Sequence, residues 1–250
     1  PIGYFYTVMF WHELTRTDHP DILKWLLHVK LWWIPALFAL PVLVAIGVRM
    51  RSRSISKGDG IYPAVLFAVF TTGLSTMALQ IALLFSFQSI YGFVYEMVGL
   101  IIAMFMGGLA LGTFIANRYV TDKANLRTLS FVQAFIALIA VLIALALPLA
   151  ASVRSPAVVF LIFSTFTFFG GLINGVDFPL ATSCCMAINK NAEKSTGLVY
   201  GVELFGACLG AVFASVVIAP ILGIIACCLF AGIANASAFI VVFMGKKAYV

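Results

Sequence analysis

The sequence predicts an all-α fold, a polytopic bundle of transmembrane helices, and three observations support this prediction. The 250-residue chain is 63% hydrophobic and only 10% charged, with a mean hydropathy of +1.12, whereas soluble domains carry about 25% charged residues. A helix that crosses a bilayer needs about 20 apolar residues, so the chain has room for about six to eight crossings. Short polar clusters separate long apolar runs along the whole sequence. These observations exclude a water-soluble domain.

The apolar runs predict about seven spans, each long enough to cross the hydrocarbon core. They cover residues 29–49, 61–88, 92–116, 128–150, 157–187, 197–219 and 223–244. Residues 29–250 are therefore expected to form one transmembrane domain. Residues 1–28 mix charged side chains with aromatic ones such as Trp11 and Trp25, which is typical of a segment that lies at the membrane interface.

Basic residues are concentrated in alternate connections between the predicted spans. Arg51, Arg118, Lys190 and Lys246 mark four basic clusters, whereas the intervening connections contain only Arg154. The positive-inside rule assigns the basic connections to the cytoplasm. We therefore expect the N-terminal segment outside and the C-terminus in the cytoplasm, and we read the net charge of +6 as a sign of orientation rather than of nucleic-acid binding.

Glycines occur four residues apart in three of the predicted spans, a spacing that allows two helix backbones to approach closely. Ordinary packing within the bundle is the simpler interpretation, and a dedicated dimer face is the alternative. The pairs are Gly108 with Gly112, Gly171 with Gly175, and Gly206 with Gly210.

Motifs of known catalytic and cofactor sites are missing from the sequence. The three histidines precede the first predicted span, so haem ligands inside the membrane are not expected. The five cysteines lack metal-ligand spacing, and no phosphate-binding loop, zinc-protease helix or nucleophile elbow occurs. We expect no cofactor and no catalytic activity in this chain. Because it begins at Pro1 without the form of a signal peptide, we also expect it to be part of a longer protein.

Three carboxylates fall within the predicted spans, although an ionised carboxylate at the bilayer centre costs at least about 2.5 kcal/mol. Glu96 is expected near the outer face, with Gln80 and Gln88 at comparable depth as a candidate outer polar site. Asp177 and Glu203 are expected nearer the cytoplasm. Each carboxylate therefore needs a polar or cationic partner.

The inner carboxylates have polar neighbours in the sequence. Asn174 and Tyr200 complete a candidate site for a cation or polyamine, and Pro179 frees a backbone carbonyl for a cation or a hydroxyl group. Two interpretations are open. In the first, the buried carboxylates form a route or site for a cationic solute. In the second, Asp177 or Glu203 forms a structural ion pair with Arg118, and Glu96 only bonds helix-terminal amides.

Several stretches resemble the membrane part of the fused spermidine-synthase-like membrane proteins of bacteria. The fairly specific strings are FQxxYGxVYE and FMGGLALG, within the run from Thr71 to Arg118. The stretches Asn174–Ala181, Tyr200–Gly223 and Pro1–Trp11 extend the resemblance to about four fifths of the chain. The end of the third predicted span, with Asn117 and Arg118, is also weakly similar to the loop motif of major facilitator transporters, whose half-domain has six helices.

The resemblance implies a bacterial inner-membrane protein whose aminopropyltransferase-like domain is absent from this chain. The glycine-rich loop and acidic residues of that domain are not present in this sequence, so the chain is not expected to be a spermidine synthase by itself. We expect a non-catalytic membrane domain that contacts the lipid bilayer and binds or transports a polyamine or another small cation. The alternative is a structural or anchoring subunit that packs against other subunits of a larger membrane complex.

Overall fold

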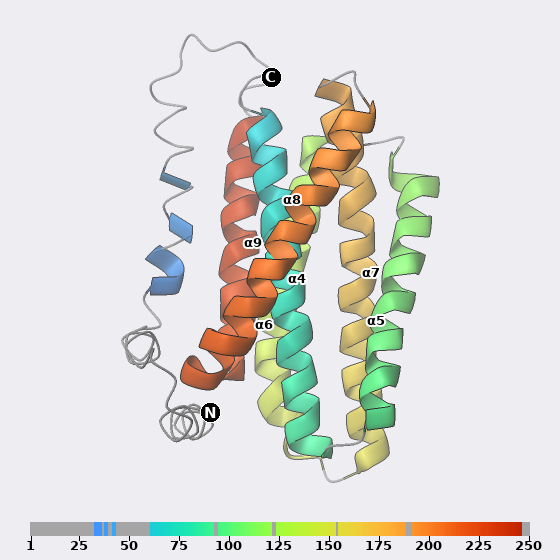
Figure 1. Cartoon of the computed structure of the whole chain (residues 1–250), viewed down its shortest axis with the longest axis vertical. Coiled ribbons are helices and arrows are strands. Elements are labelled where there is room, and N and C mark those ends of the chain that lie inside the picture. The colour runs from blue at the N-terminus through green and yellow to red at the C-terminus, as the bar shows by residue number, and fades with distance from the viewer. Residues whose placement is uncertain are drawn as a thin grey trace, which may run out of the picture.

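The computed structural model describes residues 33–36, 38–39, 42–43, 61–92, 95–121, 124–153, 155–188 and 192–246. All regular elements in these ranges are helices, and consecutive long helices run in opposite directions (Figure 1). They are α4 (Ile61–Tyr91), α5 (Tyr95–Ile115), η1 (Ala116–Val120), α6 (Leu126–Ala150), α7 (Pro156–Ile188), α8 (Ala192–Val212), η3 (Phe213–Leu222) and α9 (Ile224–Lys246).

Six helices of the described part are long and apolar enough to cross a membrane. They begin and end within a few residues of the six spans predicted after residue 60, because η1 continues α5 and η3 continues α8. The all-α membrane class is confirmed. The predicted segment 1–28 lies outside the described residues, and so does most of the predicted span 29–49.

A few described residues of that first predicted span are helical and pack on the bundle. Ile34 and Phe38 are buried, and the ring of Phe38 lies edge-on to Phe230 of α9 with centroids 5.4 Å apart. Trp33, by contrast, is exposed.

Helix α4 is the centre of the bundle, where it contacts α7, α8 and α9. Helix α5 packs mainly on α7, and α6 packs mainly on α9 (Figure 1). The outer faces of α5 and α6 expose large apolar side chains such as Met106, Phe114 and Phe131, as expected of surfaces that face lipid. Helices α4 and α9, by contrast, are the most buried of the six spans.

The predicted glycine pairs lie at close contacts within the chain. Gly108 and Gly112 of α5 pack against the backbone of α7, and Gly171 and Gly175 of α7 pack against α5 in return. On the other side of the bundle, Gly206 and Gly210 of α8 contact α4. A Cβ atom at any of these six positions would overlap a carbonyl oxygen of the neighbouring helix. Packing inside the bundle is thus the role of all three pairs.

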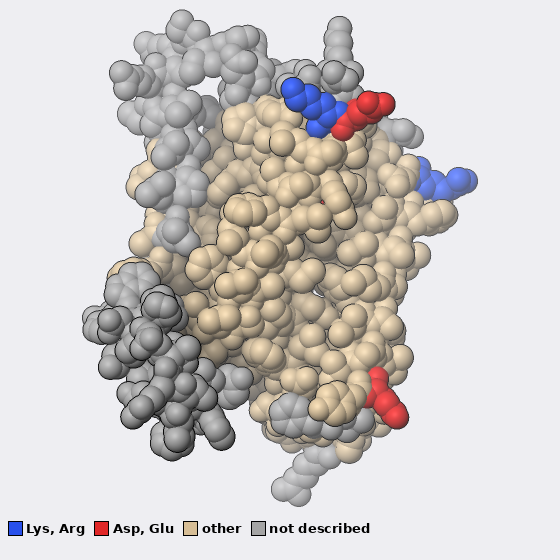
Figure 2. All heavy atoms as spheres, viewed as in Figure 1, with Lys and Arg blue, Asp and Glu red and all other residues tan. Residues whose placement is uncertain are grey.

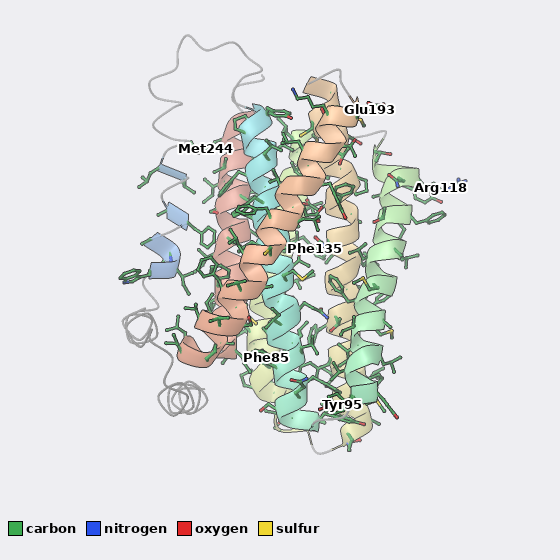
Figure 3. All side chains as sticks on the ribbon, in the orientation of Figure 1. Phe85, Tyr95, Arg118, Phe135, Glu193 and Met244 are labelled. Atoms are coloured by element: carbon green, nitrogen blue, oxygen red, sulfur yellow. The ribbon has the colours of Figure 1, made fainter. Side chains whose placement is uncertain are left out.

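The described basic side chains Arg118, Arg127 and Lys194 belong to helix ends on the same side of the bundle. Arg118 and Glu193 are labelled at this end, and Tyr95 at the opposite end (Figure 3). Among the described residues on the face shown in Figure 2, basic side chains occur only at this end, and the middle of the bundle shows neither sign of charge. We call it the basic end.

Candidate functional site

Asp177 of α7 is the most deeply buried carboxylate in the described part of the chain, with 1% of its surface exposed. Its carboxylate accepts a hydrogen bond from Gln133 of α6, whose Nε2 lies 3.3 Å from Oδ1 and 3.5 Å from Oδ2. The same nitrogen donates to Thr72 Oγ1 of α4 at 2.7 Å. Three helices thus meet at one carboxylate, because each presents a polar side chain at the same depth of the bundle.

No basic side chain of the described residues compensates this carboxylate. Arg118, the ion-pair partner considered from the sequence, is exposed and points away from the bundle (Figure 3). The ion pair of Arg118 with Asp177 or Glu203 is therefore not formed. The reason is geometric: Arg118 lies in η1 at the periphery, whereas Asp177 faces α4 and α6.

Glu203 lies on α8 and is only partly buried. It is close enough to Asp177 for the two charges to interact. Its backbone carbonyl packs against Gly73 of α4, so α8 lies close to the helix that carries Thr72. The structure brings the two inner carboxylates near one another without a hydrogen bond between them in the described residues.

The other two residues of the predicted inner site differ in position. Asn174 is buried one turn before Asp177 on α7, and its Oδ1 accepts a hydrogen bond from Thr76 Oγ1 of α4 at 3.2 Å. Tyr200 is 55% exposed, and its ring lies edge-on to Phe178 with centroids 6.1 Å apart. Asn174 thus belongs to the buried polar side chains near Asp177, and Tyr200 does not.

The backbone carbonyl freed by Pro179 is occupied by a hydroxyl group. Proline has no N–H, so the carbonyl of Gly175, four residues earlier, has no helical donor. Thr113 Oγ1 of α5 donates to this carbonyl at 3.1 Å. The sequence predicted either a cation or a hydroxyl group at this carbonyl, and in the described residues it is the hydroxyl group of Thr113.

The predicted outer site is not assembled. Glu96 is exposed in the first turn of α5, where its charge is favourable next to the helix N-terminus. Gln80 is buried, and it lies eight residues, or about 12 Å of helix, deeper than Gln88. The expectation of comparable depth was wrong for Gln80, because a helix advances about 1.5 Å with every residue.

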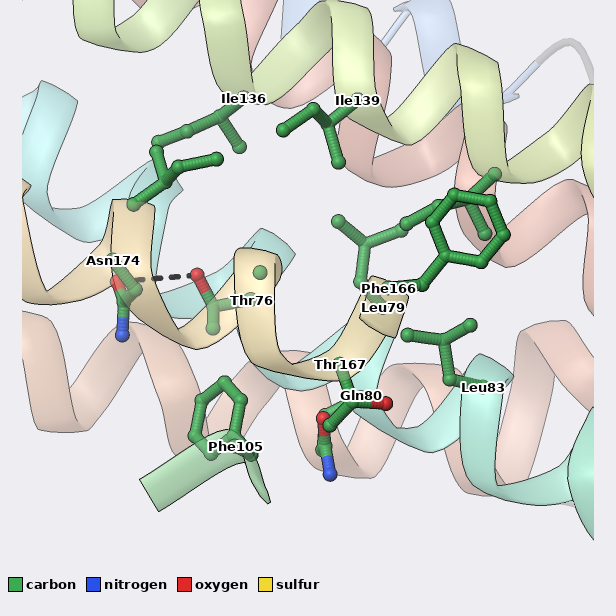
Figure 4. Close-up of a pocket in the computed structure, with 13 residues that line it drawn as sticks. Thr76, Leu79, Gln80, Leu83, Phe105, Ile136, Ile139, Phe166, Thr167 and Asn174 are labelled. Atoms are coloured by element: carbon green, nitrogen blue, oxygen red, sulfur yellow. Dashed lines mark hydrogen bonds between the residues drawn. The ribbon is translucent and has the colours of Figure 1, made fainter. Parts of the chain in front are cut away.

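Gln80 instead lines a small cavity between α4, α5, α6 and α7 (Figure 4). The space open to water in this cavity is about 30 Å³. Its lining is apolar except for Thr76, Gln80, Thr167 and Asn174. The dashed line in Figure 4 marks the bond between Thr76 and Asn174, which forms one side of the cavity.

Sequence reasoning missed Thr72, Thr76, Gln133 and Thr167. A signal existed for three polar positions of α4, because Thr72, Thr76 and Gln80 recur every four residues and so lie along one helix face. We call this face, together with Asn174 and Asp177 on α7 and Gln133 on α6, the polar row. No signal in the sequence singles out Gln133 as the neighbour of Asp177.

Comparison of the chain with models of protein families, with curated proteins and with solved structures finds no match.

Proposed function

We propose that this chain is a non-catalytic, integral membrane domain that binds a small cation at an interior site centred on Asp177. The observation that carries the proposal is the environment of this carboxylate. It is buried in a multi-pass membrane bundle, and its hydrogen-bond partners are the neutral side chains of Gln133 and Thr72. A carboxylate without a fixed cation in such surroundings favours the binding of a mobile one.

Glu203 and the polar row favour a cation as well. A second carboxylate near Asp177 doubles the negative charge that a cation would neutralise. Thr72, Gln133 and Asn174 are buried in the same bundle and carry side-chain oxygens, which are ligands of hard cations; Gln133 Oε1 has no hydrogen-bond partner among the described residues. We assign Asp177 the role of principal ligand and Glu203 that of an accessory charge.

The size of the interior space favours a small cation over a polyamine. The cavity beside Asn174, one turn from Asp177, offers only about 30 Å³ to water, and a buried water needs at least about 10–15 Å³ by this measure, so this cavity does not hold a chain of several methylene groups. The polyamine implied by the family resemblance would require α4, α6 and α7 to separate. A small monovalent cation is therefore the first solute to test.

Binding is tested with purified protein in lipid nanodiscs, by calorimetric titration with sodium, potassium and spermidine. We expect Asp177→Asn to abolish the binding of the favoured cation and Glu203→Gln to weaken it. Glu96→Gln, which neutralises an exposed carboxylate, is the matched control and should bind as the parent does. If the Asp177→Asn, Glu203→Gln double variant folds and binds cations as the parent does, the interior site is disproved.

A structural or anchoring subunit is the second candidate function, and the broad apolar outer faces of α5 and α6 favour it. Such faces suit either lipid or the helices of a partner subunit. Native mass spectrometry of the membrane-extracted protein separates the two roles. Stable association with another subunit, together with no cation binding at Asp177, would favour the anchoring role.

We further propose that the chain is the membrane domain of a spermidine-synthase-like fused protein and lacks aminopropyltransferase activity of its own. The support for this is the resemblance of the Thr71–Arg118 run and the lack of the family's glycine-rich loop in this sequence. Incubation with decarboxylated S-adenosylmethionine and putrescine should yield no product. Turnover above background would refute the non-catalytic assignment.

A further inference from the structure

The cavity next to the polar row contains buried polar atoms that have no partner. Gln80 Nε2 and Thr167 Oγ1 are both buried and make no hydrogen bond in the described structure. Gln80 is 8% exposed and Thr167 is fully buried, and both line the cavity. Buried polar groups in native proteins nearly always have a partner, so two orphans at one cavity point to a ligand.

The chemistry of these atoms specifies what the ligand must offer. An amide N–H needs an acceptor, and the Thr167 hydroxyl can donate or accept. A metal cation cannot accept a hydrogen bond, and the apolar lining residues provide no acceptor either. A water molecule donates and accepts, so it satisfies the Gln80 amide whichever way the amide is turned.

The dimensions fit water too. About 30 Å³ of space open to water centres corresponds to about two molecules. A buried water usually makes about three hydrogen bonds. Gln80 and Thr167 provide partners on one side of the cavity, and the bonded pair Thr76–Asn174 provides polar atoms on the other (Figure 4).

We propose that this cavity is a water-binding site, in which about two waters bind Gln80, Thr167 and the Thr76–Asn174 pair. Asn174 precedes Asp177 by three residues on α7, so the water continues the polar row within one helical turn of the buried carboxylate. Towards the basic end, by contrast, Leu180, Ala181 and Cys184 are buried in an apolar cluster. Hydration therefore reaches the polar row from the cavity side.

Radiolytic hydroxyl footprinting with mass spectrometry tests for this water, because radicals formed from a bound water oxidise the side chains beside it. Phe105 is 4% exposed and lines the cavity, whereas Phe163 is 1% exposed and does not line it. In the parent protein in nanodiscs we expect Phe105 to be oxidised and Phe163 to be protected. Equal protection of both rings would overturn the water site.

A pair of variants tests whether the orphan groups hold the water. Gln80→Leu combined with Thr167→Val replaces both polar side chains with apolar ones of similar size, and we expect the oxidation of Phe105 to be lost. Ser164→Ala is the matched control, because Ser164 is also a buried hydroxyl without a partner but lies outside the cavity lining. Unchanged oxidation of Phe105 in the double variant would show that Gln80 and Thr167 do not bind the water.

These measurements do not depend on cation binding. Oxidation of Phe105 in a protein whose Asp177→Asn variant binds cations normally would disprove the proposed function and leave the water site intact. Protection of Phe105 in a protein that binds cations through Asp177 would instead disprove the water site and leave the proposed function intact.

Discussion

At the scale of single residues, the bond between Gln133 and Asp177 links two helices across 44 positions of the sequence. Breaking it from one side leaves the other buried polar group with Thr72 as its main remaining partner. This costs more than removing both partners together, because two apolar side chains need no hydrogen bonds.

We predict that Gln133→Leu and Asp177→Leu each lower the free energy of unfolding by about 1–3 kcal/mol. The double variant should lose less than the sum, with a coupling energy of about 1 kcal/mol, because it removes both polar groups. Unfolding equilibria of the four proteins in mixed micelles provide the measurement. Additive losses would mean that the two side chains do not interact.

The hydroxyl group of Thr113 has an equally local role at the break in α7. It donates to the Gly175 carbonyl, which Pro179 leaves without a helical donor. We predict that Thr113→Val costs about 1 kcal/mol of stability in the parent and less in a Pro179→Ala background, where the backbone N–H of that position is restored. Thr165→Val serves as the control, because the exposed Thr165 hydroxyl bonds only within its own helix. A loss that is the same in both backgrounds would disprove this role.

At the scale of helices, glycine decides which pairs pack closely. Gly107 and Gly108 are consecutive on α5, yet a Cβ atom at Gly107 meets nothing within 4 Å, whereas one at Gly108 overlaps the carbonyl of Phe168 on α7. The two positions differ only in the direction that they face. They therefore form a matched pair for measuring the α5–α7 contact.

We predict that Gly108→Ala destabilises the bundle by about 1–3 kcal/mol, because the methyl group forces α5 and α7 apart. Gly107→Ala should leave the stability unchanged or raise it slightly, since alanine favours the helix. Thermal unfolding in detergent compares the two variants with the parent. Similar melting temperatures for both variants would contradict the close packing of these helices.

At the scale of the whole molecule, six apolar helices place successive connections at opposite ends of the bundle. Asn125 precedes α6 at the basic end, and Ser155 precedes α7 at the other, and both are exposed. By the positive-inside rule we expect the basic end to face the cytoplasm.

We predict that cysteines introduced by Asn125→Cys and Ser155→Cys react with a membrane-impermeant maleimide from opposite sides of the membrane. The background is Cys208→Ser, because Cys208 is exposed and Cys184, Cys185, Cys227 and Cys228 are buried. Asn125→Cys should react in inverted vesicles and Ser155→Cys in right-side-out vesicles. Reaction of both positions from the same side would refute the alternating arrangement of the connections.

The sequence by itself determined the fold class, the six spans after residue 60 and the glycine positions at close contacts. It could do so because burying an unpaired backbone in lipid is so costly that long apolar runs have to be helices. It also identified Asp177 as a residue that needs a partner, since a charge within an apolar run is costly in any arrangement.

Only the tertiary structure decided which polar groups meet. It placed Gln133 and Thr72 at Asp177, turned Tyr200 and Arg118 outward, and put Gln80 at a cavity instead of beside Glu96. In a soluble protein the apolar stripe of a helix reveals its inward face. Here the lipid-facing and inward faces are both apolar, so the hydrophobic pattern does not indicate the rotation of each helix, and packing between helices sets it.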